Sequence, residues 1–282
     1  MMKTIKKRGA QLNIGLIIMI IGYMILVLVP LMWIVTTSLK TNMEFTSSPW
    51  GFPAEPQWIN YFNAWVDVNF KTYALNSVYI TIASVGLIVL IGAPTAYILT
   101  RLKIRWRRVL LFLFIAGLYI PIAMVLPTEF LTLKTLNLYN TQIGLILLYV
   151  VFSLPYSILV LNGFYKTLPK EIEEAAEIDG CSRNKMFWEI IFPMSRNGIA
   201  TIMILNLIWI WNDYIFALTF LSDKGKMTLP VGLIGLMQSF KLRADWVTLF
   251  AGLCFVMIPS IILFLIFNKN MTRGLTAGAL KE

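Results

Sequence analysis

Acidic side chains are concentrated in one stretch of this sequence, LPKEIEEAAEIDGCSRNKMFWEIIFPMS at residues 168–195. Carboxylates at this spacing can cover one side of a short helix. Such a face is either simply solvated or offers a charged docking surface to another protein, and the residues alone leave both interpretations open. Six of the 14 Asp and Glu residues lie in this stretch: Glu171, Glu173, Glu174, Glu177, Asp179 and Glu189.

Catalytic chemistry of the usual kinds has little support in the sequence. There is no histidine, which excludes imidazole metal sites and a Ser/His/Asp triad. A phosphate-binding loop needs a glycine six residues before its lysine, and Phe220 stands at that place before the Gly225–Lys226 pair. We therefore expect no enzyme activity, no bound cofactor and no metal in this chain, and we expect a partner to carry out any ATP hydrolysis.

The elements that must position the acidic stretch are membrane helices. The mean hydropathy of +0.75 and the charged fraction of 13% are typical of membrane proteins. Runs of about 20 apolar residues predict helices, because each span must satisfy its own backbone hydrogen bonds in lipid. The sequence therefore predicts an all-α, polytopic fold with a transmembrane domain at residues 14–267. Its six predicted spans are Ile14–Val35, Asn76–Leu99, Val109–Pro127, Ile143–Phe164, Ile199–Leu221 and Val247–Phe267.

The distribution of Lys and Arg predicts the orientation of these spans, because basic residues resist translocation. Of the 24 basic residues, 17 lie in the tails at 1–13 and 268–282, in the loop after the second span, and in the loop at 165–198. We expect these parts, and so both termini, to be cytoplasmic. The basic clusters lie next to span ends and not on one face, so no nucleic-acid partner is expected. The outer loops are then 36–72, 128–142 and 222–246.

The acidic stretch itself predicts two short cytoplasmic helices. Pro169 suits a first helical turn and Gly180 suits a helix stop, so the first helix would run from Pro169 to Asp179. At 1.5 Å per residue this helix is about 16 Å long, which is too short to span a membrane. A second helix over Arg183–Ile191 would turn its apolar residues back toward the fifth span. Together the two helices form a bracket that could transmit the movement of a soluble partner to the membrane spans.

A motif within this bracket resembles the signature of ABC importer permeases. From Glu174 to Pro193 the sequence reads E-A-A, three residues, G, nine residues, then I-I-F-P. The signature ends in I-x-L-P, so Phe192 is the one departure, and it keeps the residue apolar. The resemblance covers most of the chain and narrows to the smaller permease of maltose-type carbohydrate transporters. Further matching stretches are NSVYITIASVGLIVLIGAPTAYILTRLKIRWRR, LNLYNTQIGLIL, WIWNDYIFAL and RGLTAGALKE.

This resemblance implies several partners. In such importers two permeases form a heterodimeric core in the bilayer, two ATP-binding subunits grip the cytoplasmic helices, and an external solute-binding protein delivers the solute. The tail would also reach the ATPase pair, although a frayed terminus is the alternative. The implied tail contacts are Arg273, Gly274, Leu275 and Thr276. The implied coupling residues are Ile172, Glu174, Ala175, Ala176, Gly180, Ile190 and Pro193.

Candidate solute and binding-protein contacts follow the predicted coupling loop. Sugars stack on aromatic faces and form hydrogen bonds with amides and carboxylates. The fifth span offers such side chains, although the same side chains could equally pack against the partner permease. In the outer loop, residues that would probe the binding protein could instead form an interfacial re-entrant loop. The solute candidates are Trp209, Asn212, Asp213 and Tyr214, and the outer-loop candidates are Leu229, Gly232 and Gly235.

Together with the predicted spans, the resemblance implies a multi-pass permease subunit of a prokaryotic inner or plasma membrane. With a second permease it would form the pathway for a sugar or oligosaccharide in an ATP-driven importer. Glycerol phosphate or another polyol-like solute is the alternative within this family. An ion-coupled secondary transporter is the alternative from another class. However, Asp213 is the one clear ionisable residue within the six predicted spans, and an ion relay normally uses several such residues.

Overall fold

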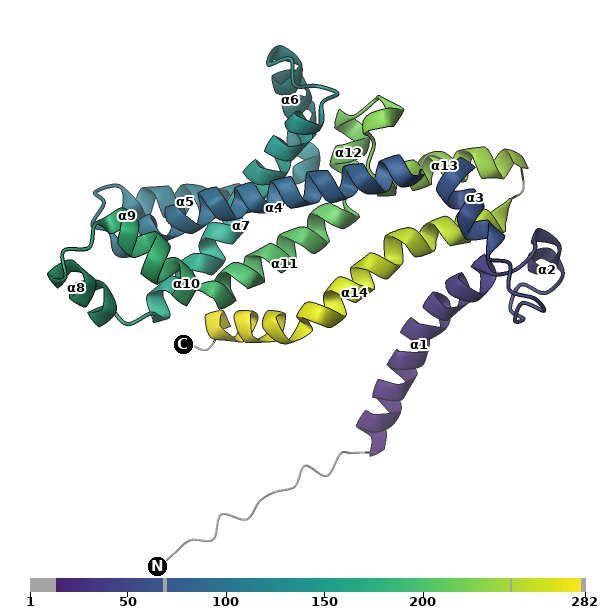
Figure 1. Ribbon diagram of the computed structural model, residues 1–282, viewed down its shortest axis with the longest axis horizontal. Helices are drawn as coiled ribbons and strands as arrows, with labels where there is room; N and C mark the ends of the chain where they lie inside the picture. The colour runs from purple at the N-terminus through teal and green to yellow at the C-terminus, as the bar shows by residue number, and fades with distance from the viewer. Residues whose placement is uncertain (1–13, 68–69, 244, 280–282) are drawn as a thin grey trace, which may run out of the picture. The chain divides into compact units, whose positions relative to one another are not determined.

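The computed structural model describes residues 14–67, 70–243 and 245–279 (Figure 1). Every regular element in these ranges is helical, which confirms the all-α class predicted from the sequence. The chain divides into two compact units. The first contains the described residues up to 64 together with 237–254, and the second contains 65–236 and 255–279.

Four helices in the described ranges are long and apolar enough to cross a membrane. Two sharply bent helix pairs pass the same test when each pair is counted together, so the structure offers between four and six candidate spans. The four continuous helices are α1 (Ile14–Ser38), α4 (Phe70–Arg101), α7 (Gln142–Thr167) and α14 (Trp246–Ala279), the last over Trp246–Ile266.

The third predicted span is broken in the structure. The sequence predicts one helix over Val109–Pro127, whereas the structure has α5 (Arg107–Leu118) and α6 (Ile122–Thr135), bent by 103°. Pro121 precedes α6 with an extended backbone at φ −63° and ψ 128°. Proline disfavours the helical region for the residue before it and has no N–H to donate. The predicted span is therefore sharply bent, because Pro121 interrupts the helix within a uniformly apolar run.

The fifth predicted span is also interrupted. The sequence predicts one helix over Ile199–Leu221, whereas the structure has α11 (Arg196–Asn212) and α12 (Ile215–Phe220). Asp213 lies between them in an extended conformation, with φ −68° and ψ 134°. Its carboxylate accepts a hydrogen bond from the backbone N–H of Ala217 at 3.3 Å and thus satisfies a free amide of α12. Asp213 is thus the C-cap of α11, and from just before Tyr214, the N-cap of α12, its side chain stabilises the break between the two helices.

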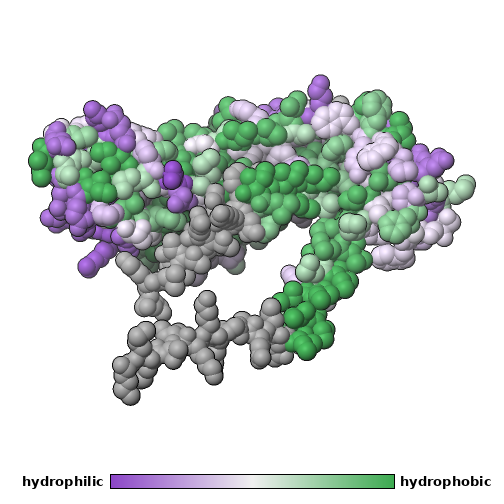
Figure 2. Space-filling view, turned by 60° about the horizontal axis from the view of Figure 1, so that its bottom comes forward, coloured by the Kyte–Doolittle hydropathy of each residue, from purple (hydrophilic) through white to green (hydrophobic). Residues whose placement is uncertain are grey.

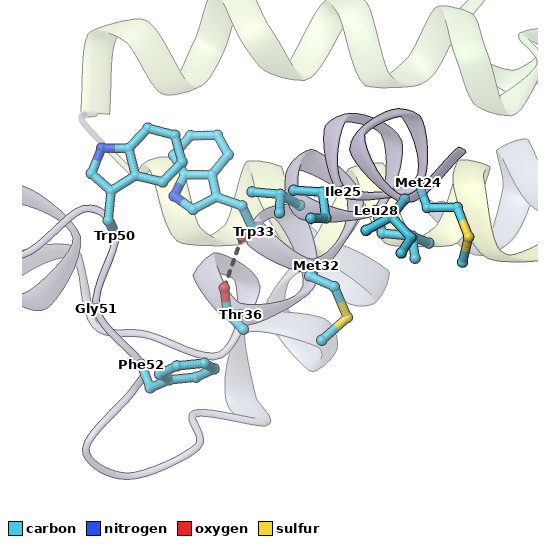
Figure 3. Close-up of a pocket in the computed structure, with 11 residues that line it drawn as sticks. Met24, Ile25, Leu28, Met32, Trp33, Thr36, Trp50, Gly51 and Phe52 are labelled. Atoms are coloured by element: carbon cyan, nitrogen blue, oxygen red, sulfur yellow. Dashed lines mark hydrogen bonds between the residues drawn. The ribbon is translucent and has the colours of Figure 1, made fainter. Parts of the chain in front are cut away.

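In the first unit, the segment after α1 is ordered by a buried lysine. Lys40 is 1% exposed, and its ammonium donates to the carbonyls of Ser48 and Pro49 at 2.9 Å each. Trp33 of α1 donates its indole N–H to the same Pro49 carbonyl at 2.8 Å. Its ring also lies 5.1 Å from that of Trp50, so an apolar groove forms between α1 and this segment (Figure 3). The short helices of this region are α2 (Asn42–Ser47) and α3 (Ile59–Asp67).

In the second unit, α4 packs along α7, α11 packs on both of these helices, and α5 packs on α7. Two buried apolar clusters hold this arrangement together. One of them joins the ends of α4, α7 and α11 to the short helices that follow α7. The remaining elements are the turn η2 (Lys224–Lys226) and α13 (Leu229–Arg243), whose last residues belong to the first unit.

Candidate functional site: the bracket between α7 and α11

The chain between α7 and α11 folds into the bracket that the sequence predicts, which we name the coupling bracket (residues 171–194). Its first helix, α8 (Glu171–Ile178), begins two residues later than the predicted Pro169. Three glutamates occupy its first turn, where the positive end of the helix dipole favours negative charge. Polar residues gather at this end of the second unit, whereas the adjoining helix surface is hydrophobic (Figure 2).

The second half of the bracket is longer than the predicted Arg183–Ile191. It consists of α9 (Arg183–Met186), a π-helical turn η1 (Phe187–Ile191) and α10 (Phe192–Met194). Phe187 is buried in the apolar cluster, and its ring lies 5.2 Å from that of Tyr97 on α4. This side of the bracket is therefore anchored on the spans by apolar packing.

Most of the predicted coupling residues surround one open groove in the bracket. The groove has a volume of about 620 Å³ and separates α8 from the start of the second half. Glu174 and Pro193 are exposed nearby but do not line it. Its lining residues are Ile172, Ala175, Ala176, Asp179, Gly180, Cys181, Ser182, Lys185 and Ile190.

Gly180 ends the first helix for a conformational reason. Its φ is +75°, in the left-handed region that side-chain-bearing residues rarely adopt. A Cβ built on this residue would meet no atom within 4 Å among the described residues. The requirement for glycine therefore lies in the backbone and not in a shortage of space.

A charged contact lies beneath α8, and the sequence analysis missed it. Arg101, the last residue of α4, places its Nε 3.1 Å from Oε1 of Glu173, with the two side chains 6% and 16% exposed. The pair is in ionic contact but lacks hydrogen-bond geometry. Tyr97 donates its hydroxyl to the other oxygen of Glu173 at 3.2 Å. The sequence held one signal for this contact, a basic residue at a span end next to an acid-rich loop.

Two of the four predicted solute residues are brought together, because Trp209 and Asp213 both contact the buried Tyr149. Trp209 is 36% exposed and Tyr214 44% exposed. The Asp213 carboxylate accepts a hydrogen bond from the buried Tyr149 hydroxyl at 2.7 Å. The side-chain oxygen of Asn212 accepts one from the Ser260 hydroxyl at 3.1 Å. Trp209 lines a pocket in the second unit. The other three side chains either make contacts within the fold or lie at its surface.

That pocket has a volume of about 380 Å³ and lies at the break between α5 and α6. Ser153 has a buried hydroxyl with no hydrogen-bond partner among the described residues. Asn206 is 5% exposed and donates to Ser157 Oγ at 3.0 Å. None of the lining residues is charged: Gly117, Leu118, Ile120, Ile122, Phe152, Ser153, Tyr156, Leu205, Asn206 and Trp209. The sequence signal for Ser153 and Tyr156 was their three-residue spacing within an apolar span.

The outer-loop candidates are mostly buried. Leu229 is 1% exposed, and its N–H donates to Ser77 Oγ on α4 at 2.8 Å. A Cβ at Gly232 would lie 2.1 Å from the Tyr73 ring. Of the three predicted binding-protein contacts, Gly235 is exposed, whereas Leu229 and Gly232 pack against α4. Their contact with a binding protein stays a prediction.

The predicted tail contacts, Arg273, Gly274, Leu275 and Thr276, belong to the α14 backbone. Their side chains lie outside the described part of the chain, as do residues 280–282 entirely.

Comparisons with known proteins agree with this architecture. The sequence profile of the family described as "Binding-protein-dependent transport system inner membrane component" matches residues 88–276. The chain is 32% identical over 275 residues to the diacetylchitobiose uptake system permease protein NgcG of Streptomyces coelicolor, covering 98% of this chain and 90% of that protein. It is 38% identical over 256 residues to the sulfoquinovosyl glycerol transport system permease protein SmoH of Agrobacterium fabrum, covering 90% of this chain and 89% of that protein.

The fold has a solved counterpart. A chain from a bacterial ABC transporter involved in the import of the acidic polysaccharide alginate superposes with a TM-score of 0.79, at 23% identity, over 91% of this chain and 95% of that chain. Family profile, relatives and fold point the same way: this chain belongs to the binding-protein-dependent transport system inner membrane components, the permeases of ABC importers.

Proposed function

We propose that this chain is one of two permease subunits in an ATP-driven importer of sugars or oligosaccharides. Taking the α5–α6 pair and α11 as spans beside the four continuous helices gives six spans, and we place both termini and the coupling bracket on the cytoplasmic side. The basic residues at these ends support this orientation. A second permease would complete the pathway, two ATP-binding subunits would drive it, and an external binding protein would supply the solute.

The observation that carries the proposal is the assembly of the motif residues around one groove. Ile172, Ala175, Ala176, Gly180 and Ile190 come from both halves of the bracket and line the same hollow. Small side chains leave room for a partner's backbone or side chain to enter. The apolar cluster behind the bracket links it to α4, α7 and α11. Movement of a partner seated in the groove would thus be transmitted to three spans at once.

The solute class follows from the relatives and from the pocket at the α5–α6 break. The relatives are named for diacetylchitobiose, sulfoquinovosyl glycerol and trehalose transport. The pocket offers hydroxyl and amide groups together with Trp209, a combination suited to sugar hydroxyls and ring faces. No lining residue is basic, so this pocket offers a phosphate hydrogen bonds from hydroxyl, amide and indole groups but no cation, and glycerol phosphate stays the second candidate.

Ion coupling has little support in the described residues. Asp213, the one clear ionisable residue within the six predicted spans, is held by the Tyr149 hydroxyl and by a backbone amide of α12. A relay group must exchange partners as it takes up and releases its ion. Asp213 instead fixes the break between two helices.

Helix α1 is suited to the lipid bilayer and to the second permease. No residue of its apolar 18-residue window is buried in the chain. A helix that is hydrophobic all round is covered by lipid or by protein. We infer that the second permease covers one side of α1 and lipid covers the rest.

The test is transport by the purified complex in liposomes. The complex is supplied with its binding protein, and uptake of radiolabelled chitobiose, trehalose, maltose and glycerol 3-phosphate is compared with ATP inside or with an ion gradient alone. The proposal predicts uptake of a sugar that requires both ATP and the binding protein. Uptake driven by the ion gradient without ATP would overturn it.

A further inference from the structure

We propose that Arg101 is a positioning residue that fixes the coupling bracket to the membrane spans and makes the connection between α7 and α8 rigid. This inference rests on the function proposed above. Arg101 lies outside the ABC-permease motif, on a helix far from it in sequence, and acts together with Glu173 and Tyr97.

The weak point of the bracket is its connection to α7. Helix α7 ends at Thr167, Leu168 is extended with φ −72° and ψ 138°, and α8 begins at Glu171. A short non-helical connection of this kind can absorb changes in φ and ψ and act as a hinge. If the connection bent freely, a push on α8 would be lost there and would not reach α7.

Arg101 binds on both sides of this connection. One terminal nitrogen of its guanidinium donates to the carbonyls of Tyr165 and Leu168, at the end of α7. Its Nε lies 3.1 Å from the carboxylate of Glu173 in the first turn of α8. A planar guanidinium carries five donors in a fixed fork, so one side chain can hold two elements at a set angle. The side chain of Arg101 therefore bridges the hinge.

The contact between Arg101 and Glu173 also distinguishes the roles of two neighbouring glutamates. Glu173 lies under α8 with its side chain 16% exposed, paired with Arg101 and bonded to the Tyr97 hydroxyl. Glu174, by contrast, is exposed. Glu173 thus belongs to the link with the spans, whereas Glu174 is free to meet an ATP-binding subunit.

Folding of the bracket does not depend on the ion pair alone. Met186, Phe187 and Ile191 are buried against the spans on the other half of the bracket. Loss of Arg101 should therefore leave the bracket folded and able to bind its partner, but with a mobile connection to α7. This separation of assembly from transmission makes the proposal testable.

The experiment uses the whole importer in liposomes with chains carrying Arg101→Gln, Glu173→Gln or Tyr97→Phe. The measured quantities are the ATPase subunit retained, the ATP hydrolysed, the sugar imported per ATP, and hydrogen exchange in the peptide covering residues 166–171. We expect Arg101→Gln and Glu173→Gln to retain the ATPase, to speed exchange in this peptide, and to lower sugar imported per ATP about tenfold, within the usual range of coupling free energies. Tyr97→Phe should have a smaller effect in the same direction.

Lys103→Gln is the matched control, because Lys103 is an exposed cation two residues from Arg101, and it should behave as the wild type. The proposal is overturned if Arg101→Gln imports as much sugar per ATP as the wild type, or if uptake falls only in proportion to the complex recovered. Failure of the wild-type chain to retain an ATPase would instead refute the proposed function itself.

Discussion

Gly180 gives the sharpest prediction at the scale of single residues. Its φ of +75° is the reason that glycine is needed at this position, since a Cβ there would meet no described atom within 4 Å. Gly180→Ala should destabilise the bracket by about 1 kcal/mol, whereas Gly180→Asn should cost less, because asparagine tolerates the left-handed region better. Thermal unfolding of the detergent-solubilised chain measures this difference. Equal unfolding temperatures for the Ala and Asn variants would contradict the backbone explanation.

The same residue separates backbone strain from occlusion of the groove. Gly180→Trp adds a bulky side chain to the groove lining and should release the ATP-binding subunit. Gly180→Ala carries similar backbone strain without that bulk and should retain the subunit. Co-purification of the ATPase with each variant measures the outcome, and loss of the ATPase from both variants would mean that the groove itself is not the binding surface.

Glu44 predicts a pH dependence in the segment after α1. Hydrogen bonds from the backbone N–H groups of Thr41 and Ala54 lower the pKa of Glu44. A lowered pKa in the folded state means that this contact stabilises the segment above the unfolded pKa, and that the stabilisation is lost as pH falls through the folded pKa. Glu44→Gln should therefore flatten the acid side of the stability profile, measured by tryptophan fluorescence.

Glu55→Gln is the control for this prediction, because Glu55 is an exposed carboxylate on the same segment. Its profile should match that of the wild type. An acid limb that is equally steep with and without the Glu44 carboxylate would refute the assignment.

At the scale of elements, Asn140 holds the turn before α7 against the loop after α12. It adopts a φ of 57°, and its side-chain oxygen accepts hydrogen bonds from the N–H groups of Ser222 and Asp223 at 3.0 Å each. Asn140→Gly keeps the backbone conformation and removes both bonds, so it should cost about 1–3 kcal/mol. Lys224 and Lys226 in the freed loop should then become accessible to trypsin.

Asn137 supplies the matched control for Asn140. It has a nearly identical φ of 58° and an exposed side chain. Asn137→Gly should change neither the unfolding temperature nor the rate of tryptic cleavage. If the two glycine variants behave alike, the side-chain hydrogen bonds of Asn140 do not hold this loop.

The sequence predicted the elements better than their interruptions. Long apolar runs located α1, α4, α7 and α14 because hydropathy alone decides whether a helix can lie in lipid. The break at Asp213 was missed, because it is a local hydrogen-bonding event within an apolar run. Gly180 was identified as a helix stop because its effect is also local.

Contacts between distant elements could not be predicted in the same way. The pairing of Arg101 with Glu173 joins two elements through the fold, and a single sequence carries no signal for such a pairing beyond charge and span position. The burial of Leu229 and Gly232 depends likewise on where α4 lies. Both features required the structure.

At the scale of the whole molecule, the chain is built as part of a larger assembly. Apolar α1 is uncovered, the groove of the coupling bracket is open, and the uncharged pocket lies at a break between two membrane helices. Each of these surfaces corresponds to one proposed partner: the second permease, the ATP-binding subunit and the sugar. The central claim is that the chain works only within this assembly.

Purification of the chain from its native membrane in mild detergent tests this claim most directly. A tag at the exposed Ser47 avoids both the bracket and the tail, and mass spectrometry identifies every protein retained. The account predicts a second permease and an ATPase with a phosphate-binding loop, with the ATPase lost from the Gly180→Trp variant. A chain that purifies alone and still transports solute on an ion gradient without ATP would contradict it.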